Sequence, residues 1–436
     1  MFMKKYIIPT FFSLALLTGM TGCKKDSMPG HHAGAAMAID SFTATHGGGG
    51  TEVLISGTNF SSDTSSIHVF INGNPLAIVA ATYQQIMAVV PKKCGSGHVI
   101  VKIGSDTAVS AGIFNYSFTR TVSTFAGNGV AGFANGQGTD AQFNFNGQNW
   151  YRSLGLAIDD KLNLYVADPG NHCIRKIDSL GNVTTFVGNP NNAGYADGIG
   201  SAALFSLPYG LALDAAGNLY SADPGNGDVR KITPDGTATT WDRWPYPWEI
   251  AVDPTTGNVY YSNCGAPGSV FPVTAAGSGA AIATNLSYPI GLAFDKTGNM
   301  YVSLNGDNTI TKFTAGTWQS SVIAGQTGSA GYVNGPGASA KFDHPWGLSI
   351  DAAGNLYVAG NGTWDGGTYN TDQSIRYIEA GTFQVSNFAG SGAAGYTDAV
   401  GAAAAFNAPT GVTVDKNGTV YVLDKNNNRI RKIVSE

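Results

Sequence analysis

The feature that most constrains the fold is a sequence word that recurs along most of the chain. It reads Gly-Leu-Ala-x-Asp or a close variant, followed by Gly-Asn-Leu-Tyr-Val and, in the best copies, by Ile-Arg-Lys-Ile. Successive copies lie 39 to 64 residues apart, as expected for a unit of about 40 residues with insertions. Each copy contains four short β-type runs separated by turn residues, so each predicts one propeller blade. Six copies predict a six-bladed β-propeller; the aspartate of the word falls at Asp159, Asp214, Asp253, Asp295, Asp351 and Asp415.

The wording of these copies resembles the NHL repeat, most plainly in the run from Asp168 to Ile177. The resemblance covers residues 119–436 and implies an NHL-type propeller. The last copy ends three residues after Ile433 and lacks a fourth strand, whereas Thr121–Gly127 forms an orphan fourth strand before the first copy. We expect the orphan strand to pair beside Arg431–Ile433 and close the ring, because closure removes two exposed strand edges.

The N-terminus predicts export. Lys4 and Lys5 precede a 15-residue apolar run, which is shorter than a spanning helix needs, and small residues stand before Cys23. This arrangement resembles the bacterial lipobox, so residues 1–22 are expected to be a lipoprotein signal peptide and Cys23 the lipidated residue; an ordinary signal peptide with an incidental cysteine is the alternative. Residues 23–37 have no periodicity and predict a flexible tether. Lys25-Asp26-Ser27 partly resembles the export signal of Bacteroidota surface lipoproteins, which implies an outer-membrane protein exposed at the cell surface.

Residues 38–118 predict a separate β-sandwich. Short alternating strands are bounded by glycine and asparagine turns, at the spacing of an immunoglobulin-like fold. The words Leu54–Phe60, Val69–Gly73 and Met87–Pro91 resemble the IPT/TIG domain. The expected fold class is therefore all-β: a six-bladed NHL-type propeller preceded by an immunoglobulin-like (IPT/TIG) β-sandwich. Domains of this kind serve as spacers or docking modules.

Composition excludes some partners. The net charge is −5 and Lys and Arg are not clustered, which argues against nucleic acid and leaves the lipid anchor as the predicted contact with a membrane. Beyond Cys23, the cysteines Cys94, Cys173 and Cys264 lie far apart and form no recognisable disulfide framework.

Glycine-rich inserts precede blades one, two, five and six but not blades three and four. Each connects an outer strand to the next inner strand, so we expect the inserts to lie on one face of the disc. That face should be open over the junctions before blades three and four. The phenylalanines that close the inserts are expected to plug between blades: Phe143, Phe205, Phe342 and Phe406.

The open sector contains the densest aromatic stretch of the chain, Trp241–Trp248. Aromatic faces with interspersed polar groups suit sugar or peptide binding. For Trp248 and Trp346, packing between blades is an equally good interpretation. Asp168, Asp223 and Asp424, each followed by an asparagine, favour a structural role in binding turn amides. The candidate ligand-binding residues are Trp241, Arg243, Trp244, Tyr246, Trp248, Tyr288, Trp346, Trp364, Trp150 and Arg152.

Three functions follow from these patterns. The favoured one is a non-catalytic propeller that binds a glycan or protein ligand at the bacterial surface. A metal-dependent enzyme of the gluconolactonase or lyase type and an envelope scaffold are the alternatives. No cofactor is indicated, except that Glu249, Asn263 and Asn305 supply one acid and two amides for a weak calcium site. His344 precedes a proline near the axis as a possible ligand, and no catalytic set stands out.

Overall fold

The computed structural model describes residues 30–146, 155–190, 192–243, 246–264, 267–274, 277–360 and 372–436. The chain divides into two compact units, Met1–Ser117 and Phe118–Glu436. The described residues form strands and six short 3-10 turns, so the all-β expectation is confirmed. None of their helices has the length and apolarity to cross a membrane. The 3-10 turns are η1 (Thr64–Ser66), η2 (Gly138–Asp140), η3 (Pro169–Asn171), η4 (Gly200–Ala202), η5 (Gly401–Ala403) and η6 (Lys425–Asn427).

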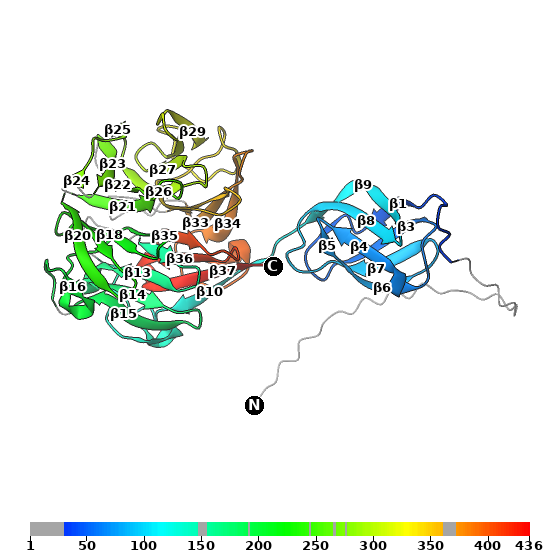
Figure 1. The fold of residues 1–436 in the computed structure, drawn as a ribbon, viewed down its shortest axis with the longest axis horizontal. Helices are drawn as coiled ribbons and strands as arrows, with labels where there is room; N and C mark the ends of the chain where they lie inside the picture. The colour runs from blue at the N-terminus through cyan, green and yellow to red at the C-terminus, as the bar shows by residue number, and fades with distance from the viewer. Residues whose placement is uncertain are drawn as a thin grey trace, which may run out of the picture. The chain divides into compact units, whose positions relative to one another are not determined.

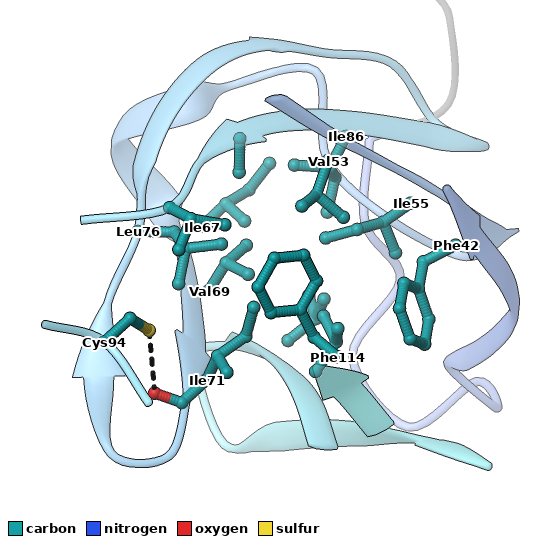
Figure 2. Close-up of a cluster of buried hydrophobic side chains, with 14 of the residues drawn as sticks. Phe42, Val53, Ile55, Ile67, Val69, Ile71, Leu76, Ile86, Cys94 and Phe114 are labelled. Carbon is teal, nitrogen blue, oxygen red and sulfur yellow. Dashed lines mark hydrogen bonds between the residues drawn. The ribbon is translucent and has the colours of Figure 1, made fainter. Parts of the chain in front are cut away.

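The first unit is a sandwich of two sheets. Alternate residues of the strands point inward and fill its core around Phe114, as Figure 2 shows. Cys94 lies in this core and its thiol donates to the Ile71 carbonyl at 3.5 Å. One sheet has the order β1 (Ala38–Thr43), β3 (Glu52–Thr58), β7 (Gln85–Val89), β6 (Ala77–Ala81), and the other β2 (His46–Gly47), β9 (Asp106–Tyr116), β8 (Gly97–Ile103), β4 (Ile67–Ile71), β5 (Asn74–Pro75).

The segment before β1 packs against the sandwich. The His31 ring bonds the Asn59 carbonyl at 2.7 Å and the Asp106 carboxylate at 3.0 Å. The Asn59 side chain in turn donates to the carbonyls of His32 and Ala35. His31, His32, Gly34 and Ala35, which belong to the segment predicted to be a tether, are thus hydrogen-bonded to the domain. The predicted signal peptide and Cys23 lie outside the described residues.

The described residues of the second unit form six sheets, whose antiparallel strands occupy four positions with the inner strand first. In blade three the outer position is occupied by two short strands, which both pair with the third strand. Blade one holds β12 (Leu156–Ile158), β13 (Leu164–Asp168), β14 (Cys173–Ile177) and β15 (Asn182–Gly188); blade two holds β17 (Leu211–Leu213), β18 (Leu219–Asp223), β19 (Asp228–Ile232) and β20 (Thr237–Arg243); blade three holds β21 (Pro247–Val252), β22 (Val259–Asn263), β23 (Gly268–Thr274), β24 (Gly277–Ser278) and β25 (Ala283–Leu286).

The remaining blades complete the ring. The inner strands contact one another in the order β12, β17, β21, β26, β31, β35 and back to β12. Blade four holds β26 (Pro289–Phe294), β27 (Met300–Leu304), β28 (Thr309–Phe313) and β29 (Ser320–Gly325); blade five holds β31 (Pro345–Ile350), β32 (Leu356–Gly360), β33 (Gln373–Ile378) and β34 (Gln384–Gly392); blade six holds β35 (Pro409–Val414), β36 (Val420–Asp424), β37 (Arg429–Ser435) and β10 (Arg120–Ala126).

The strand that closes the ring is the predicted one. β10 pairs antiparallel with β37, from Arg120 opposite Ser435 to Thr124 opposite Arg431. The two strands lie side by side in Figure 1, although they come from the two ends of the propeller sequence. The ring-closure prediction is confirmed.

The inserts do not lie flat on one face, and that prediction is wrong. Three of them form two-residue strands that pair with an outer strand of the blade they precede: β11 (Gly136–Gln137) with β15, β16 (Gly198–Ile199) with β20 and β30 (Gly335–Pro336) with β34. β11 pairs with Asn182 and Val183, at the start of β15, so the insert runs along the outside of the blade. The physical reason is that blades diverge outward, and the inserts fill the gaps.

A fully buried arginine anchors each insert. Arg175 donates to the Asp168 carboxylate at 2.9 Å and to the insert carbonyls of Gln142 and Ala134. Its guanidinium lies 5.2 Å from the centroid of the Phe143 ring, which is itself fully buried. The predicted plugging by the closing phenylalanines is therefore confirmed, since all four are fully buried: Phe143, Phe205, Phe342 and Phe406.

The same anchor recurs in every blade that has an insert. Each arginine is 0% exposed and faces two insert rings, one from the start and one from the end of the insert. The sets are Arg175 with Phe133 and Phe143, Arg230 with Tyr195 and Phe205, Arg376 with Tyr332 and Phe342, and Arg431 with Tyr396 and Phe406.

Candidate functional site

The candidate site begins at residues that precede the inner strands, immediately in blades three to six and by four residues in blade two. In blades two to six this residue stands before a proline and adopts a positive φ between 50° and 65°. A non-glycine residue in this region is strained by about 1 to 3 kcal/mol, and a following proline disfavours helical backbone further. Strained backbone of this kind concentrates at functional sites. The five residues are Leu207, Tyr246, Tyr288, His344 and Ala408.

Side chains from the preceding blade hold this conformation. The His344 amide donates to the Asn308 side-chain oxygen at 2.9 Å, and the Ala408 amide donates to Gln373 at 2.6 Å. The Leu207 amide donates to the His172 ring at 3.4 Å. Each acceptor lies where its blade's third strand begins, so at Leu207, His344 and Ala408 neighbouring blades jointly fix the residue before the proline.

Three consecutive members of this set present larger side chains. Tyr246 is 55% exposed, while Tyr288 and His344 are half-buried. They come from blades three, four and five, whose inner strands are neighbours. The His344 ring bonds the Asp343 carboxylate at 2.7 Å, which fixes its orientation. We call Tyr246, Tyr288 and His344 the pre-proline cluster.

Arg243 adds a cation beside the start of blade three. This exposed arginine lies 4.2 Å from the centroid of the Tyr195 ring, on the insert of blade two. Opposite it in the sheet is Asp228, whose carboxylate is 1% exposed and has no hydrogen-bond partner in the described part of the chain. Burial raises the pKa of Asp228 to about 6, although Arg230 and Arg243 oppose that shift.

The predicted tryptophans have other roles. Trp248 and Trp346 are 4% and 0% exposed and meet edge to face with ring centroids 6.4 Å apart, so they are not displayed rings. Trp241 is half-buried and packs edge to face on Tyr220 at 5.7 Å. Its position in the repeat is that of Phe186, which packs on its own blade's tyrosine in the same way. Comparing the repeats in the sequence could have shown this structural role.

Several candidates lie outside the described residues: Trp150, Arg152, Trp244 and Trp364. Among the candidates that the structure describes, Arg243 and Tyr246 are exposed, and Tyr288 and Trp241 are half-buried. Tyr195 was missed by the sequence reasoning. The sequence feature that could have identified it is the aromatic residue found near the start of every insert.

The residues predicted to bind a metal ion are buried or half-buried in the propeller. Glu249 and Asn305 are buried, at 8% and 0% exposure, and Asn263 is half-buried. The Asn305 amide donates to the Pro345 carbonyl at 3.4 Å. In the described ranges, no three or more His, Cys, Asp or Glu side chains are grouped so that they could hold a metal ion. Asp168 and Asp424 bind turn amides as expected, and each also pairs with a buried arginine, which the sequence did not show.

The class of protein follows from the two folds and from family matches. Residues 37–119 match the family described as IPT/TIG domain, and residues 406–433 match the NHL repeat. The chain therefore carries an IPT/TIG domain followed by an NHL-type β-propeller, as the sequence words indicated.

The chain is also similar to individual proteins. The chain is 28% identical over 323 residues to the chloroplastic Protein SUPPRESSOR OF QUENCHING 1 of Arabidopsis thaliana, which covers 70% of this chain and 26% of the relative. The chain spans less than half the length of the curated relatives it matches.

Solved structures from Bacteroides share the fold over nearly the whole chain. A structural genomics protein of unknown function from Bacteroides thetaiotaomicron superposes with a TM-score of 0.63 at 18% identity, covering 94% of this chain and 100% of that one. An auxiliary nutrient binding protein from Bacteroides ovatus superposes with a TM-score of 0.58 at 20% identity, over the same shares of the two chains. At these identities the likeness concerns the fold.

Proposed function

We propose that this protein is a non-catalytic binding protein of the bacterial envelope, whose propeller captures a glycan or another nutrient-derived ligand at the pre-proline cluster. The observation that carries the proposal is that Tyr246 and Tyr288 both have a positive, strained φ and stand at the two blade junctions without inserts. Aromatic rings held rigidly beside polar groups stack on sugar rings at a small entropic cost. Arg243 and His344 supply the polar groups.

The named neighbours support this function. Two structures that share the fold are described as auxiliary nutrient binding proteins, from Bacteroides ovatus and Bacteroides thetaiotaomicron. A protein ligand would use the same rings, and the binding assay below separates the two kinds of ligand.

The test is a glycan array and a panel of secreted proteins, probed with the full-length chain and with the double variant Tyr246→Ala, Tyr288→Ala. We expect the double variant to lose at least tenfold in affinity for whichever ligand binds, because each ring contributes stacking contacts. Leu180→Ala is the matched control, since Leu180 is 73% exposed and belongs to the turn between the third and fourth strands of blade one. Undiminished binding by the double variant would rule out the cluster.

We also propose that Cys23 carries the lipid anchor and that the chain is displayed on the outer membrane. Support comes from the lipobox-like sequence before Cys23 and from the Bacteroides neighbours. Incorporation of a labelled fatty acid into the wild type but not into Cys23→Ser is the expected result. Protease accessibility on whole cells then tests surface display.

A further inference from the structure

Glu249 occupies a position that is glycine in the other five blades: Gly155, Gly210, Gly291, Gly347 and Gly411. The glycines have a structural cause. A Cβ atom at Gly155, Gly210, Gly291 or Gly347 would clash with a carbonyl oxygen of the next blade. Blade three alone places a side chain here, and that side chain ends in a carboxyl group. A departure from the repeat that buries an acid needs a reason beyond packing.

The carboxyl group is held in a fixed place. Its Oε1 accepts the Ile250 amide at 3.0 Å, and the Leu211 amide of blade two is a further donor. Glu249 is 8% exposed, and in the described residues no cationic side chain forms an ion pair with it. The acid is therefore buried and hydrogen-bonded, and among the described residues no ion pair balances the charge of its ionised form.

Glu249 faces a cavity on the propeller axis. The cavity has a volume of ≈ 220 Å³, is lined by all six inner strands, and has Glu249 as the single ionisable residue among the described residues of its lining. Trp248, Ile290 and Trp346 pack together where the inner strands begin. Along each of these three strands, the apolar residue stands between the pre-proline residue and the first residue that lines the cavity.

The cavity borders a groove at the other end of the inner strands. This groove, of ≈ 620 Å³, shares Ile158, Leu213 and Val252 with the axial cavity. Its volume lies within the range of about 300 to 1,000 Å³ that holds small ligands. Since these residues end the inner strands and the pre-proline residues begin them, the groove opens on the opposite face. Its charged lining is three carboxylates, Asp159, Asp160 and Asp214, against the two amines of Lys161 and Lys176.

We propose that the groove and axial cavity form a second binding site, which takes a primary ammonium group on an aliphatic chain. The chain packs on Ile158, Leu213 and Val252, and the ammonium group pairs with Glu249. A metal ion fits less well, because it needs several oxygen ligands and the cavity offers one carboxylate. The ammonium group belongs either to a free alkylamine or to a lysine side chain.

The test is calorimetric titration of the full-length chain at pH 9 with n-pentylammonium, and separately with Nα-acetyl-lysine methylamide to distinguish the two sources. At this pH the carboxyl group is mostly ionised, because burial raises the pKa of Glu249 to about 8, whereas an alkylammonium group keeps its proton up to a pKa of about 10.4. We expect n-pentylammonium to bind and 1-pentanol, of the same shape without charge, to bind at least tenfold more weakly.

Two variants keep the proposal falsifiable. Glu249→Gln preserves the size of the side chain and its bonds to the two amides, so it should fold and lose at least tenfold in ammonium affinity. Glu249→Gly restores the residue of the other five blades and should also lose binding. Equal ammonium binding by wild type and Glu249→Gln would overturn the proposal, as would Glu249-dependent binding of Ca²⁺ without ammonium binding. Failure of this site leaves the pre-proline cluster untouched, since the two lie on opposite faces.

Discussion

The propeller fills the gaps between its blades in two ways. Before blades one, two, five and six, an insert wraps a buried arginine, as Arg376 shows with bonds to the carbonyls of Lys341 and Val333. Blades three and four carry Phe271 and Thr311 at the position of that arginine in the third strand. Their junctions are filled by hydrocarbon, for example by Tyr261 stacked on Phe271 at 5.4 Å.

The difference shows where the fold leaves room for function. An insert-bearing junction has buried charges whose hydrogen bonds require one geometry. Changes at such a junction therefore destabilise the fold. A hydrocarbon junction tolerates variation as long as its volume is filled. Tyr246 and Tyr288 stand at the two hydrocarbon junctions, and Glu249, the departure from the glycine rule, belongs to the same sector.

Deleting Arg120–Ala126 should have the largest effect on this arrangement. The deletion removes the outer strand of blade six and leaves β37 with an open edge in the insert-bearing sector. We expect cooperative unfolding of the propeller to be lost, as followed by near-ultraviolet circular dichroism in urea. A cooperative transition at the wild-type midpoint would show that the ring is stable without its closing strand.

Arg431→Met is the next largest change. It leaves Asp424 buried at 0% exposure without its partner, and breaking such a pair costs about 3 to 5 kcal/mol. Thr311→Val, at the same position in a hydrocarbon junction, is the matched control. Its Oγ1 is buried and has no hydrogen-bond partner among the described residues, so its loss should be neutral or slightly stabilising. Equal losses in urea denaturation would erase the distinction between the two kinds of junction.

Much of this arrangement follows from the sequence, and the exceptions have physical causes. The repeat words predict the blades, and the orphan strand predicts the closure, because hydrogen-bonding edges must be paired. The path of the inserts was not predicted, since Arg175 reads as part of a strand word while its partners lie 33 and 41 residues away. The positive φ of Tyr246 could not be predicted either, because a residue before proline normally has an extended backbone.

Glu249→Gln tests the hydrocarbon sector through pH. Burial raises the folded-state pKa of Glu249 from an ordinary 4.5 to about 8, so the protonated acid stabilises the fold below pH 4.5 and this stabilisation is lost as pH rises to 8. The variant has no such loss. Its advantage over wild type in urea denaturation should grow by about 2 to 4 kcal/mol between pH 5 and pH 8.5. Asp228 and Asp424 titrate in both proteins, so their contributions to the pH dependence cancel in the difference between wild type and variant. Parallel pH profiles would mean that Glu249 is solvated.

The smallest effect is expected at the rim of an insert. Asp197 bonds the buried Arg230 at 2.9 Å, but its own side chain is 48% exposed, so solvent screens the pair. Asp197→Ala should therefore cost about 0.5 to 1 kcal/mol in urea denaturation. Blades one and five already have Asn135 and Asn334 in this place. Asp197→Asn should then be nearly neutral, because the arginine needs an acceptor at the rim and also interacts electrostatically with the buried Asp223 and Asp228. A loss in Asp197→Asn as large as in Asp197→Ala would show instead that blade two, whose Asp228 lacks a hydrogen-bond partner in the described structure, depends on the charge of Asp197.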